Sequence, residues 1–263
     1  HNAFPGVYPR DRGYDSILEE QIAGWLEEAL ALVPEDIKAT ARIVPGESEA
    51  AALSAAAEEL GADLLVVGAR KGGLLGRFQM GSAVNVLLHS APVPVALAPR
   101  GYSHPGPISR VTTFFGPRQG TSDVIAIGLD RARRRGIPLR LVSLVLSGES
   151  DMQGLGTDVP SALNAYANRK LADSAQHMLD AGHATTEVAS GKDVAAALEK
   201  LDWEDGEIAV VGSSRMAVPG RLFLGTTASR MLRLIPVPMV VVPAGYMQAG
   251  EENNLLPKGG KNT

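Results

Sequence analysis

Short runs of apolar residues alternate along the chain with longer segments that carry apolar side chains at helical spacing. The runs at 64–67 and 208–211 are typical of strands that are buried on both faces. Residues 16–33 instead place apolar side chains three and four positions apart, after a Ser16…Glu19 pair that suits a helix start. Such alternation predicts a parallel sheet with helices on both of its faces.

The same pattern predicts the other elements. Strands are expected at 38–44, 95–98, 110–115, 139–146 and 239–242. Helices are expected at 47–60, 81–88, 121–135 and 225–232, and a glycine or a proline stops each of them.

One stretch of the sequence occurs twice. Residues 66–99 (VVGARKGGLLGRFQMGSAVNVLLHSAPVPVALAP) align without a gap with residues 210–243 (VVGSSRMAVPGRLFLGTTASRMLRLIPVPMVVVP), at an offset of 144 residues. An offset of this length indicates a duplicated domain and not a solenoid. We therefore expect two domains, at 1–99 and 110–243, joined by a linker at 100–109 and followed by a disordered tail at 244–263.

The duplication also shows what the first copy lacks. Residue 145 corresponds to residue 1, so the strand and helix at 110–135 have no counterpart. A sheet without its opening strand, helix and strand leaves strand edges unpaired. We therefore expect that the natural chain extends upstream by roughly 35 residues or more. The alternative is that those residues exist and are missing only from the sequence given.

The loop after each repeated strand carries the candidate chemistry. Glycines allow a backbone to approach a ligand closely, and the free amides at a helix N-terminus favour an anion. Gly81-Ser82 and Gly225-Thr226 suit such a phosphate cradle. A hydroxyl side chain at these places also suits a simple helix cap, so both interpretations stand.

The sequence does not contain the motifs of other nucleotide-binding, catalytic or metal-binding sites. The sequence has no Walker A lysine, no G-x-G-x-x-G after a strand, no G-x-S-x-G elbow and no histidine at metal-ligand spacing. It has no cysteine, which fits a reducing cytoplasm. A net charge of −4 gives no general attraction to nucleic acid, and no apolar run approaches the ~20 residues of a membrane helix. We expect neither enzymatic activity nor a bound metal.

Together these motifs resemble the universal stress protein family. The shared pattern is a glycine loop after a buried strand, then a Gly-[Ser/Thr] helix start and a Pro-Val-Pro strand, in both copies. The resemblance implies two tandem doubly wound α/β domains of the Rossmann-like, nucleotide-binding type, the first one incomplete. It also implies that the last strands pair two domains, across a dimer or within a tandem chain. We expect an intrachain pseudo-dimer of the two copies and a homodimer of the chain.

The resemblance also implies where a ligand binds, because ATP-binding members hold the triphosphate at these loops. The candidate residues are Gly68, Ala69, Arg70, Lys71, Gly81, Ser82 and Ala83 in the first copy, and Gly212, Ser213, Arg215, Gly225 and Thr226 in the second. Lys71 and Arg215 stand where those members have glycine, and a cation there either neutralises a phosphate or blocks the site. The family's aspartate near the adenosine falls at about Gly116, where no carboxylate is present.

We therefore expect a cytoplasmic regulatory protein of the stress response that binds ATP or another anionic small molecule at its glycine-rich loops. One alternative is a ligand-free dimerisation scaffold with degenerate nucleotide sites. The other is an ATP-hydrolysing member, against which the missing carboxylate and the absence of a base argue. Nucleic acids and membranes are not expected as partners.

Overall fold

The computed structural model describes residues 12–68, 81–99, 101–116, 121–146, 182–214, 217 and 220–246. The chain divides into two units, residues 1–47 and 48–263. The first unit contains α1 (Arg12–Ala31), which confirms the helix that the sequence predicts at 16–33. In the described residues, no helix is long and apolar enough to cross a membrane.

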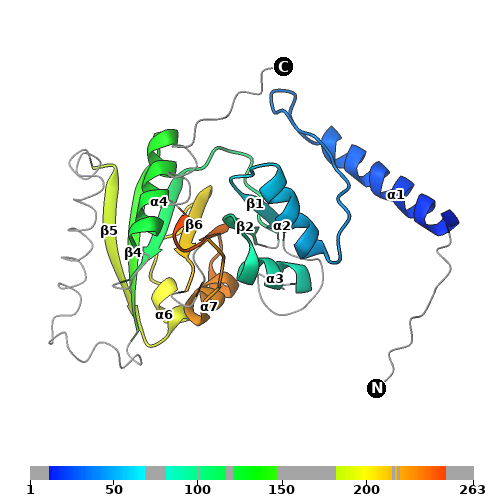
Figure 1. Cartoon of the computed structure of the whole chain (residues 1–263). Coiled ribbons are helices and arrows are strands. Elements are labelled where there is room, and N and C mark those ends of the chain that lie inside the picture. Colours follow the sequence, from blue (N-terminus) through cyan, green and yellow to red (C-terminus); the bar gives the residue numbers. More distant parts are fainter. Residues whose placement is uncertain are drawn as a thin grey trace, which may run out of the picture. The chain divides into compact units, whose positions relative to one another are not determined.

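The second unit is built on one seven-stranded sheet. In spatial order its strands are β1 (Leu65–Gly68), β2 (Val95–Ala98), β7 (Met239–Val242), β6 (Glu207–Gly212), β3 (Arg110–Phe115), β4 (Leu139–Leu146) and β5 (Ala184–Gly191). Neighbouring strands are parallel within each copy of the repeat. The two copies meet at β2 and β7, which run antiparallel (Figure 1). This pairing confirms that the last strands join the copies within the chain.

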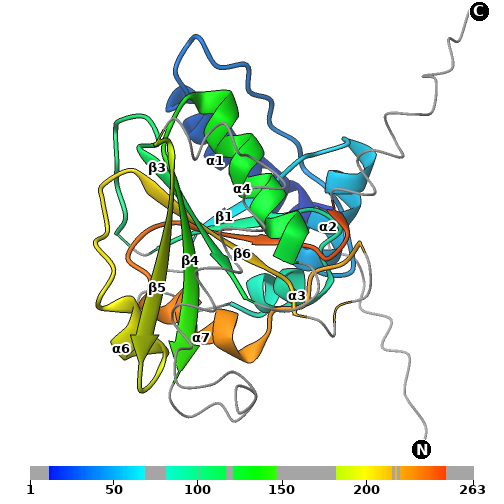
Figure 2. The same ribbon diagram turned by 90° about the vertical axis from the view of Figure 1, so that its left-hand side faces the viewer.

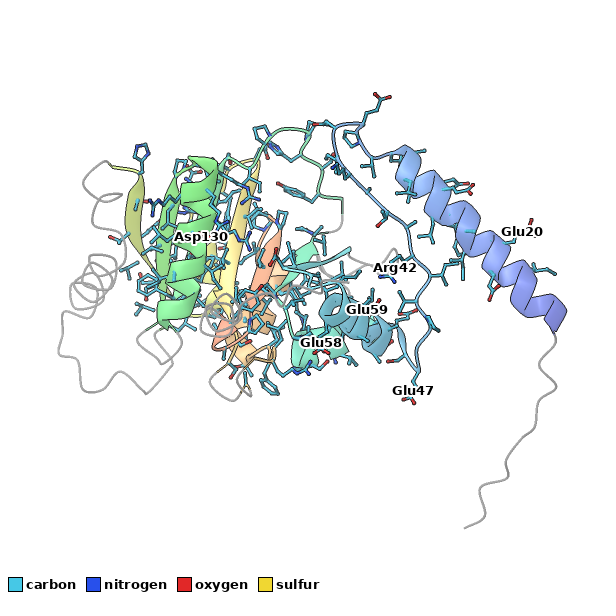
Figure 3. The ribbon with its side chains drawn as sticks, turned by 45° about the horizontal axis from the view of Figure 1, so that its top comes forward. Glu20, Arg42, Glu47, Glu58, Glu59 and Asp130 are labelled. Atoms are coloured by element: carbon cyan, nitrogen blue, oxygen red, sulfur yellow. The ribbon has the colours of Figure 1, made fainter. Side chains whose placement is uncertain are left out.

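Helices cover both faces of this sheet. The described helices of the unit are α2 (Glu49–Glu59), α3 (Ser82–Ser90), α4 (Thr121–Arg135), α6 (Val194–Leu198) and α7 (Thr226–Leu234). Helix α4 packs its buried side chains on one face, whereas α3, α6 and α7 share the core of the other face (Figure 2). Charged side chains such as Glu58 on α2 and Asp130 on α4 lie on the outer sides of their helices (Figure 3).

Two parts of the sequence prediction need correction. Residues 38–44 do not form a strand. At the offset of the repeat they correspond to β5, which pairs with β4, and the counterpart of β4 falls at or before residue 2 of the given sequence. No described strand pairs with the backbone at 38–44, whereas β5 pairs with β4 along its whole length. In the second copy, β5 and α6 are present although the sequence analysis did not predict them.

Contacts of the second copy extend past β7. The backbone N–H of Gly220 donates to the carbonyl of Ala244 at 2.8 Å, and the Tyr246 hydroxyl donates to the carbonyl of Asp63 at 3.3 Å. Residues 247–263, most of the segment expected to be a tail, lie outside the described residues.

Candidate ligand-binding site

The candidate site of the second copy lies where β3 and β6 end. From β3 the chain continues to β4 and β5 on one side, and from β6 it continues to β7 on the other. Ligands of doubly wound sheets bind outside the carboxyl ends of the strands at such a reversal. The backbone at this edge is glycine-rich, with Gly116 after β3 and Gly212 at the end of β6.

Helix α7 begins at the same edge, and no described side chain caps its first turn. Its N-cap is Gly225, in extended conformation, and its first turn holds no acidic residue. Gly81 caps α3 in the same way. Ser82 and Thr226 are thus the first helical residues, so neither hydroxyl side chain is at the N-cap position. The simple helix cap that the sequence also allowed is therefore not formed at the N-cap. The first-turn amides instead form a positive end that suits an anion.

Backbone hydrogen bonds hold the loop after β6 in place. The N–H of Ser213 donates to the carbonyl of Val242 at 2.8 Å, and the N–H of Ser214 donates to the carbonyl of Phe223 at 2.8 Å. The hydroxyl of Ser213 accepts from the N–H of Phe223 at 3.3 Å. A Cβ on Gly225 would lie only 3.3 Å from Cβ of Ser214, so the loop and the start of α7 are in direct contact.

Gly212 has a packing role that requires no ligand. A Cβ at this position would overlap Cγ2 of Val124 on α4. The glycine therefore allows α4 to lie against the end of β6. A glycine at this point of the pattern is explained by helix–strand packing as well as by ligand approach.

The first copy presents a less complete site. Gly68 ends β1 and Gly81-Ser82-Ala83 begins α3, but β1 is the edge strand of the sheet. Val66 on β1 is 68% exposed. No described strand takes the place beside β1 that β3 has beside β6. The predicted site residues Ala69, Arg70, Lys71 and Arg215 lie outside the described residues.

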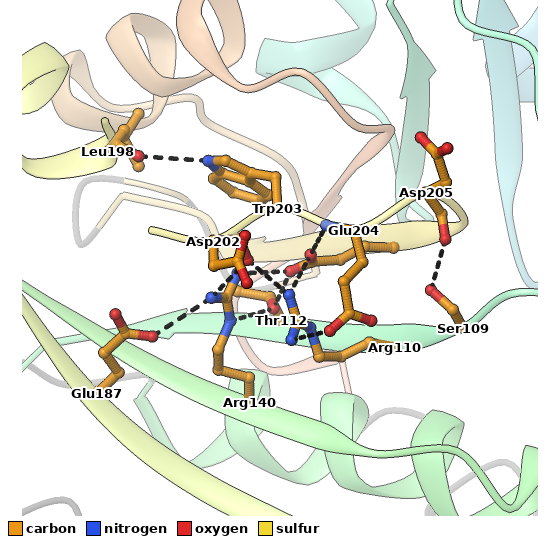
Figure 4. A network of polar contacts seen from close by, with 11 residues as sticks. Ser109, Arg110, Thr112, Arg140, Glu187, Leu198, Asp202, Trp203, Glu204 and Asp205 are labelled. Atoms are coloured by element: carbon orange, nitrogen blue, oxygen red, sulfur yellow. Dashed lines mark hydrogen bonds and ion pairs between the residues drawn. The ribbon is translucent and has the colours of Figure 1, made fainter. Parts of the chain in front are cut away.

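Sequence reasoning missed a buried ionic cluster at the amino ends of β3, β4 and β6. The carboxylate of Glu207 is fully buried and accepts hydrogen bonds from Arg110 Nη2 at 2.7 Å and from Arg140 Nη2 at 2.8 Å. It also accepts from the Thr112 hydroxyl and, at 3.0 Å, from the N–H of Glu204 (Figure 4). These strand ends lie opposite the edge where a ligand is expected.

Electrostatics keep this carboxylate ionised. Burial alone raises the pKa of Glu207, but hydrogen bonds from Arg110, Thr112 and the Glu204 N–H, together with the charge of Arg140, outweigh burial and lower that pKa. The ring of Trp203 covers the Arg140 guanidinium at 5.5 Å. The carboxylate of Glu207 is therefore fully hydrogen-bonded, whereas Nε of Arg110 is buried without a hydrogen-bond partner among the described residues. The signal that could have found this structural cluster is a charged residue beginning an otherwise apolar strand.

Comparisons with known proteins agree with this architecture. A family model described as the universal stress protein family matches residues 6–99 and 116–243. Universal stress proteins of Mycobacterium tuberculosis and Mycobacterium bovis are each 30% identical over 253 residues, which cover 92% of this chain and 86% of the relative.

Solved structures share the fold. A putative universal stress protein from Pseudomonas aeruginosa superposes with a TM-score of 0.57 at 16% identity, covering 94% of this chain and 84% of that one. A universal stress protein from Archaeoglobus fulgidus gives a TM-score of 0.58 at 18% identity, covering 91% and 84%. With two tandem matches of the family model and relatives that align over nearly the whole sequence, the chain belongs to the universal stress protein family.

Proposed function

We propose that this protein acts in the stress response as a regulatory binding protein, and that ATP or another anionic small molecule occupies the site of its second copy. The observation that carries the proposal is the start of α7. No described side chain caps its first turn, which holds no acidic residue and stands where β3 and β6 diverge. An anion there gains both the free amides and the helix dipole.

The second copy suits a ligand better than the first. Only the second copy has, among the described residues, strands on both sides of the reversal point. Gly116 takes the place of the family's aspartate, so recognition would rest on phosphate and not on the ribose. ATP is therefore one member of a wider class of phosphorylated ligands.

The role would be binding and not catalysis. The described residues that follow β3 and β6 are Gly116, Ser213 and Ser214, which supply neither a general base nor a metal-binding carboxylate. We further propose a cytoplasmic location and a homodimer. Occupancy of the site would stabilise one arrangement of the glycine loop and so bias contacts with partner proteins.

A substitution at the first position of α7 tests the site with two readouts of opposite sign. In the ligand-free protein, Thr226→Asp complements the helix dipole and should raise the free energy of unfolding by about 0.3–1 kcal/mol. The same carboxylate repels a phosphate and should weaken ATP binding about tenfold or more in calorimetry. Ser82→Asp, at the equivalent position of α3, is the matched control and should leave that affinity unchanged.

Analysis of the purified protein comes first. Denaturation should release a nucleotide or another phosphorylated molecule, identified by mass spectrometry, in near-stoichiometric amounts. If Ser82→Asp and not Thr226→Asp weakens ATP binding, the first copy holds the ligand. If no small molecule is released and ATP gives no heat, the binding proposal is wrong.

The second candidate is a ligand-free scaffold. It is favoured by the contacts between the copies, which include the antiparallel pairing of β2 with β7 and backbone hydrogen bonds from the loop before α7 to the end of α3. In that case the glycine loop serves to join the copies. Thr226→Asp would then change stability alone.

A further inference from the structure

A groove of about 460 Å³ lies between the two copies, and its lining includes neither Gly225 nor Thr226 of the candidate phosphate site. Helix α2 contributes Ala50 and Ser54, and α3 contributes Val86 and His89. The third wall, with Arg221 and Phe223, belongs to the second copy and is part of the loop that leads into α7. Each copy therefore supplies part of this groove.

Hydrogen bonds between the copies fix the walls of the groove. The N–H of Leu222 donates to the carbonyl of Ala91 at 3.0 Å, and the N–H of Leu224 donates to the carbonyl of Leu88 at 3.0 Å. The loop thereby satisfies carbonyl groups at the end of α3 that have no helical partner. Ligand sites are typically preformed concave surfaces of this size.

One end of the groove is basic. Arg221 contacts Glu58 Oε1 from Nη2 at 3.2 Å and donates from Nη1 to the carbonyl of Ser90 at 3.3 Å. A guanidinium has five N–H donors, so these two contacts leave donors for a ligand. The pair with Glu58 is half exposed on both sides and is a weak competitor for a second anion.

His89 adds a second polar group beside Arg221. Its Nδ1 donates to the carbonyl of Asn85 at 2.7 Å. The other ring nitrogen, Nε2, takes no part in this bond. The imidazole meets the ring of Phe223 edge-on, with 5.1 Å between the ring centres. This packing orients the imidazole next to an aromatic wall.

The rest of the groove is apolar. Ala50 is buried, and Val86 is 48% exposed although it is a large apolar residue on a helix. With the ring of Phe223 opposite, these side chains can cover the apolar body of a small molecule. An isolated phosphate would make no use of this surface, and Glu58 at the rim disfavours a highly charged ligand.

We propose that the groove is a second ligand site, for a small organic molecule with one carboxylate or sulfonate group and an aromatic or aliphatic body. Arg221 holds the anionic group in bidentate fashion, with His89 beside it. Val86 and Phe223 cover the body. This site is separate from the proposed phosphate site and does not depend on it.

Two related fluorescent probes test this proposal on the full chain. 8-Anilinonaphthalene-1-sulfonate has an aromatic body and one sulfonate, whereas N-phenyl-1-naphthylamine has the same rings without the charge. We expect the sulfonate probe to bind saturably at one site per chain, and Arg221→Gln to weaken it about tenfold through loss of the charge-assisted bonds. Arg221→Lys should recover part of the affinity, and the neutral probe should not respond to either variant.

Further variants separate the groove from general effects. Val86→Glu places a carboxylate at an exposed position in the apolar wall. It should also weaken the binding of the sulfonate probe about tenfold. Arg134→Gln is the matched control, because Arg134 is an exposed arginine paired with Asp130 at 2.7 Å on α4. The affinity of Arg134→Gln for the sulfonate probe should equal that of the unsubstituted protein. Circular dichroism melting checks the fold of each variant.

Three results would overturn the proposal. The first is equal affinity of the sulfonate probe for Arg221→Gln and Arg134→Gln. The second is equal affinity of both probes for the unsubstituted protein, which would make the groove a plain apolar surface. The third is a self-association, seen by light scattering, that excludes the sulfonate probe and that Val86→Glu abolishes, because a second copy of the chain would then fill the groove. If Arg221→Gln fails to fold, the Val86→Glu variant tests the site instead, and an unchanged affinity of this variant for the sulfonate probe would overturn the proposal.

Discussion

Ala96 lies opposite Val240, the residue 144 positions later in the chain, in the antiparallel pairing of β2 with β7. Since 144 is the offset of the repeat, each of these residues is the counterpart of the other. The repeat exchanges the pairs on either side, Val95 with Val241 and Leu97 with Met239, because Val95 corresponds to Met239 and Leu97 to Val241. A local twofold axis therefore passes through the Ala96–Val240 pair, as in the isologous interface of a symmetric dimer.

This geometry predicts energetic coupling between Leu97 and Met239, which are 2% and 0% exposed. Leu97→Ala and Met239→Ala should each lower the free energy of unfolding by about 2–5 kcal/mol. Because the two residues face each other, the double variant should differ from the sum of the single variants by about 0.5–3 kcal/mol. Urea denaturation of the four proteins measures this cycle.

An exposed valine serves as the control for this cycle. Val66 on β1 is 68% exposed, so Val66→Ala should have a much smaller effect and should add to Leu97→Ala without coupling. Strict additivity of Leu97→Ala and Met239→Ala would contradict the interface described here.

The strands that the sequence predicted best are the apolar ones. β2, β3, β4 and β7 have the predicted bounds, because each consists mostly of apolar or β-branched residues and lies between glycine, proline or polar positions. β5 lies at the edge of the sheet, and Val188 is its one large apolar residue, so it lacks this signal. Comparison with residues 38–44 could have revealed β5, since the two segments correspond in the repeat.

The sites were harder to predict, because their residues come together only in the folded chain. The glycine pattern located the start of α7 correctly, since a helix start is a local signal. Arg110 and Glu207, however, are 97 residues apart, and the parallel pairing of β3 with β6 brings them together. His89 and Arg221 belong to different copies, and no local pattern relates them.

The fit of α4 against β3 gives a second prediction. Gly128 lies on α4, and a Cβ there would overlap Oγ1 of Thr113, which is fully buried. Alanine normally favours a helix over glycine by about 1 kcal/mol, but here the overlap should make Gly128→Ala destabilising by about 1–3 kcal/mol. Thermal denaturation measures the effect.

A pair of further variants shows whether overlap is the cause. Thr113→Ala removes the overlapping oxygen, so it should restore part of the stability lost in Gly128→Ala. Gly24→Ala in α1, where a Cβ meets nothing within 4 Å, should keep or increase the helical circular dichroism signal. A stabilising effect of Gly128→Ala would contradict the close packing of α4.

The short helix α6 gives a third prediction. Its N-cap is Asp193, whose carboxylate accepts from the N–H of Ala196 at 2.9 Å. α6 has only five residues and buries Val194, Ala197 and Leu198, so loss of the cap should also disturb the packing of these side chains in the core. Asp193→Ala should cost about 1 kcal/mol in unfolding free energy, whereas Asp193→Asn, which keeps an acceptor, should cost much less. Equal losses in urea denaturation would show that the cap does not matter.

The buried Glu207 predicts how stability depends on pH. Its pKa in the folded protein is held below the ordinary value of 4.5, because the bonds from the arginines and from Thr112 outweigh burial. A pKa that is lower in the folded state gives stability that is present above about pH 4.5 and is lost as the pH falls through the lower folded value. The free energy of unfolding should therefore decrease below pH 4.5.

Variants of the cluster separate this effect from general acid denaturation. At pH 7, Glu207→Gln leaves Arg110 and Arg140 without their buried partner and should cost about 3–5 kcal/mol. Its deficit relative to the unsubstituted protein should shrink as the pH falls, because both proteins then carry a neutral side chain at this position. Thr112→Val removes one bond to the carboxylate and should move the acid transition to higher pH. Glu58→Gln, at an exposed ion pair, should change little. A deficit of Glu207→Gln that stays constant from pH 7 to pH 3 in urea denaturation would show that this carboxylate does not govern the acid response.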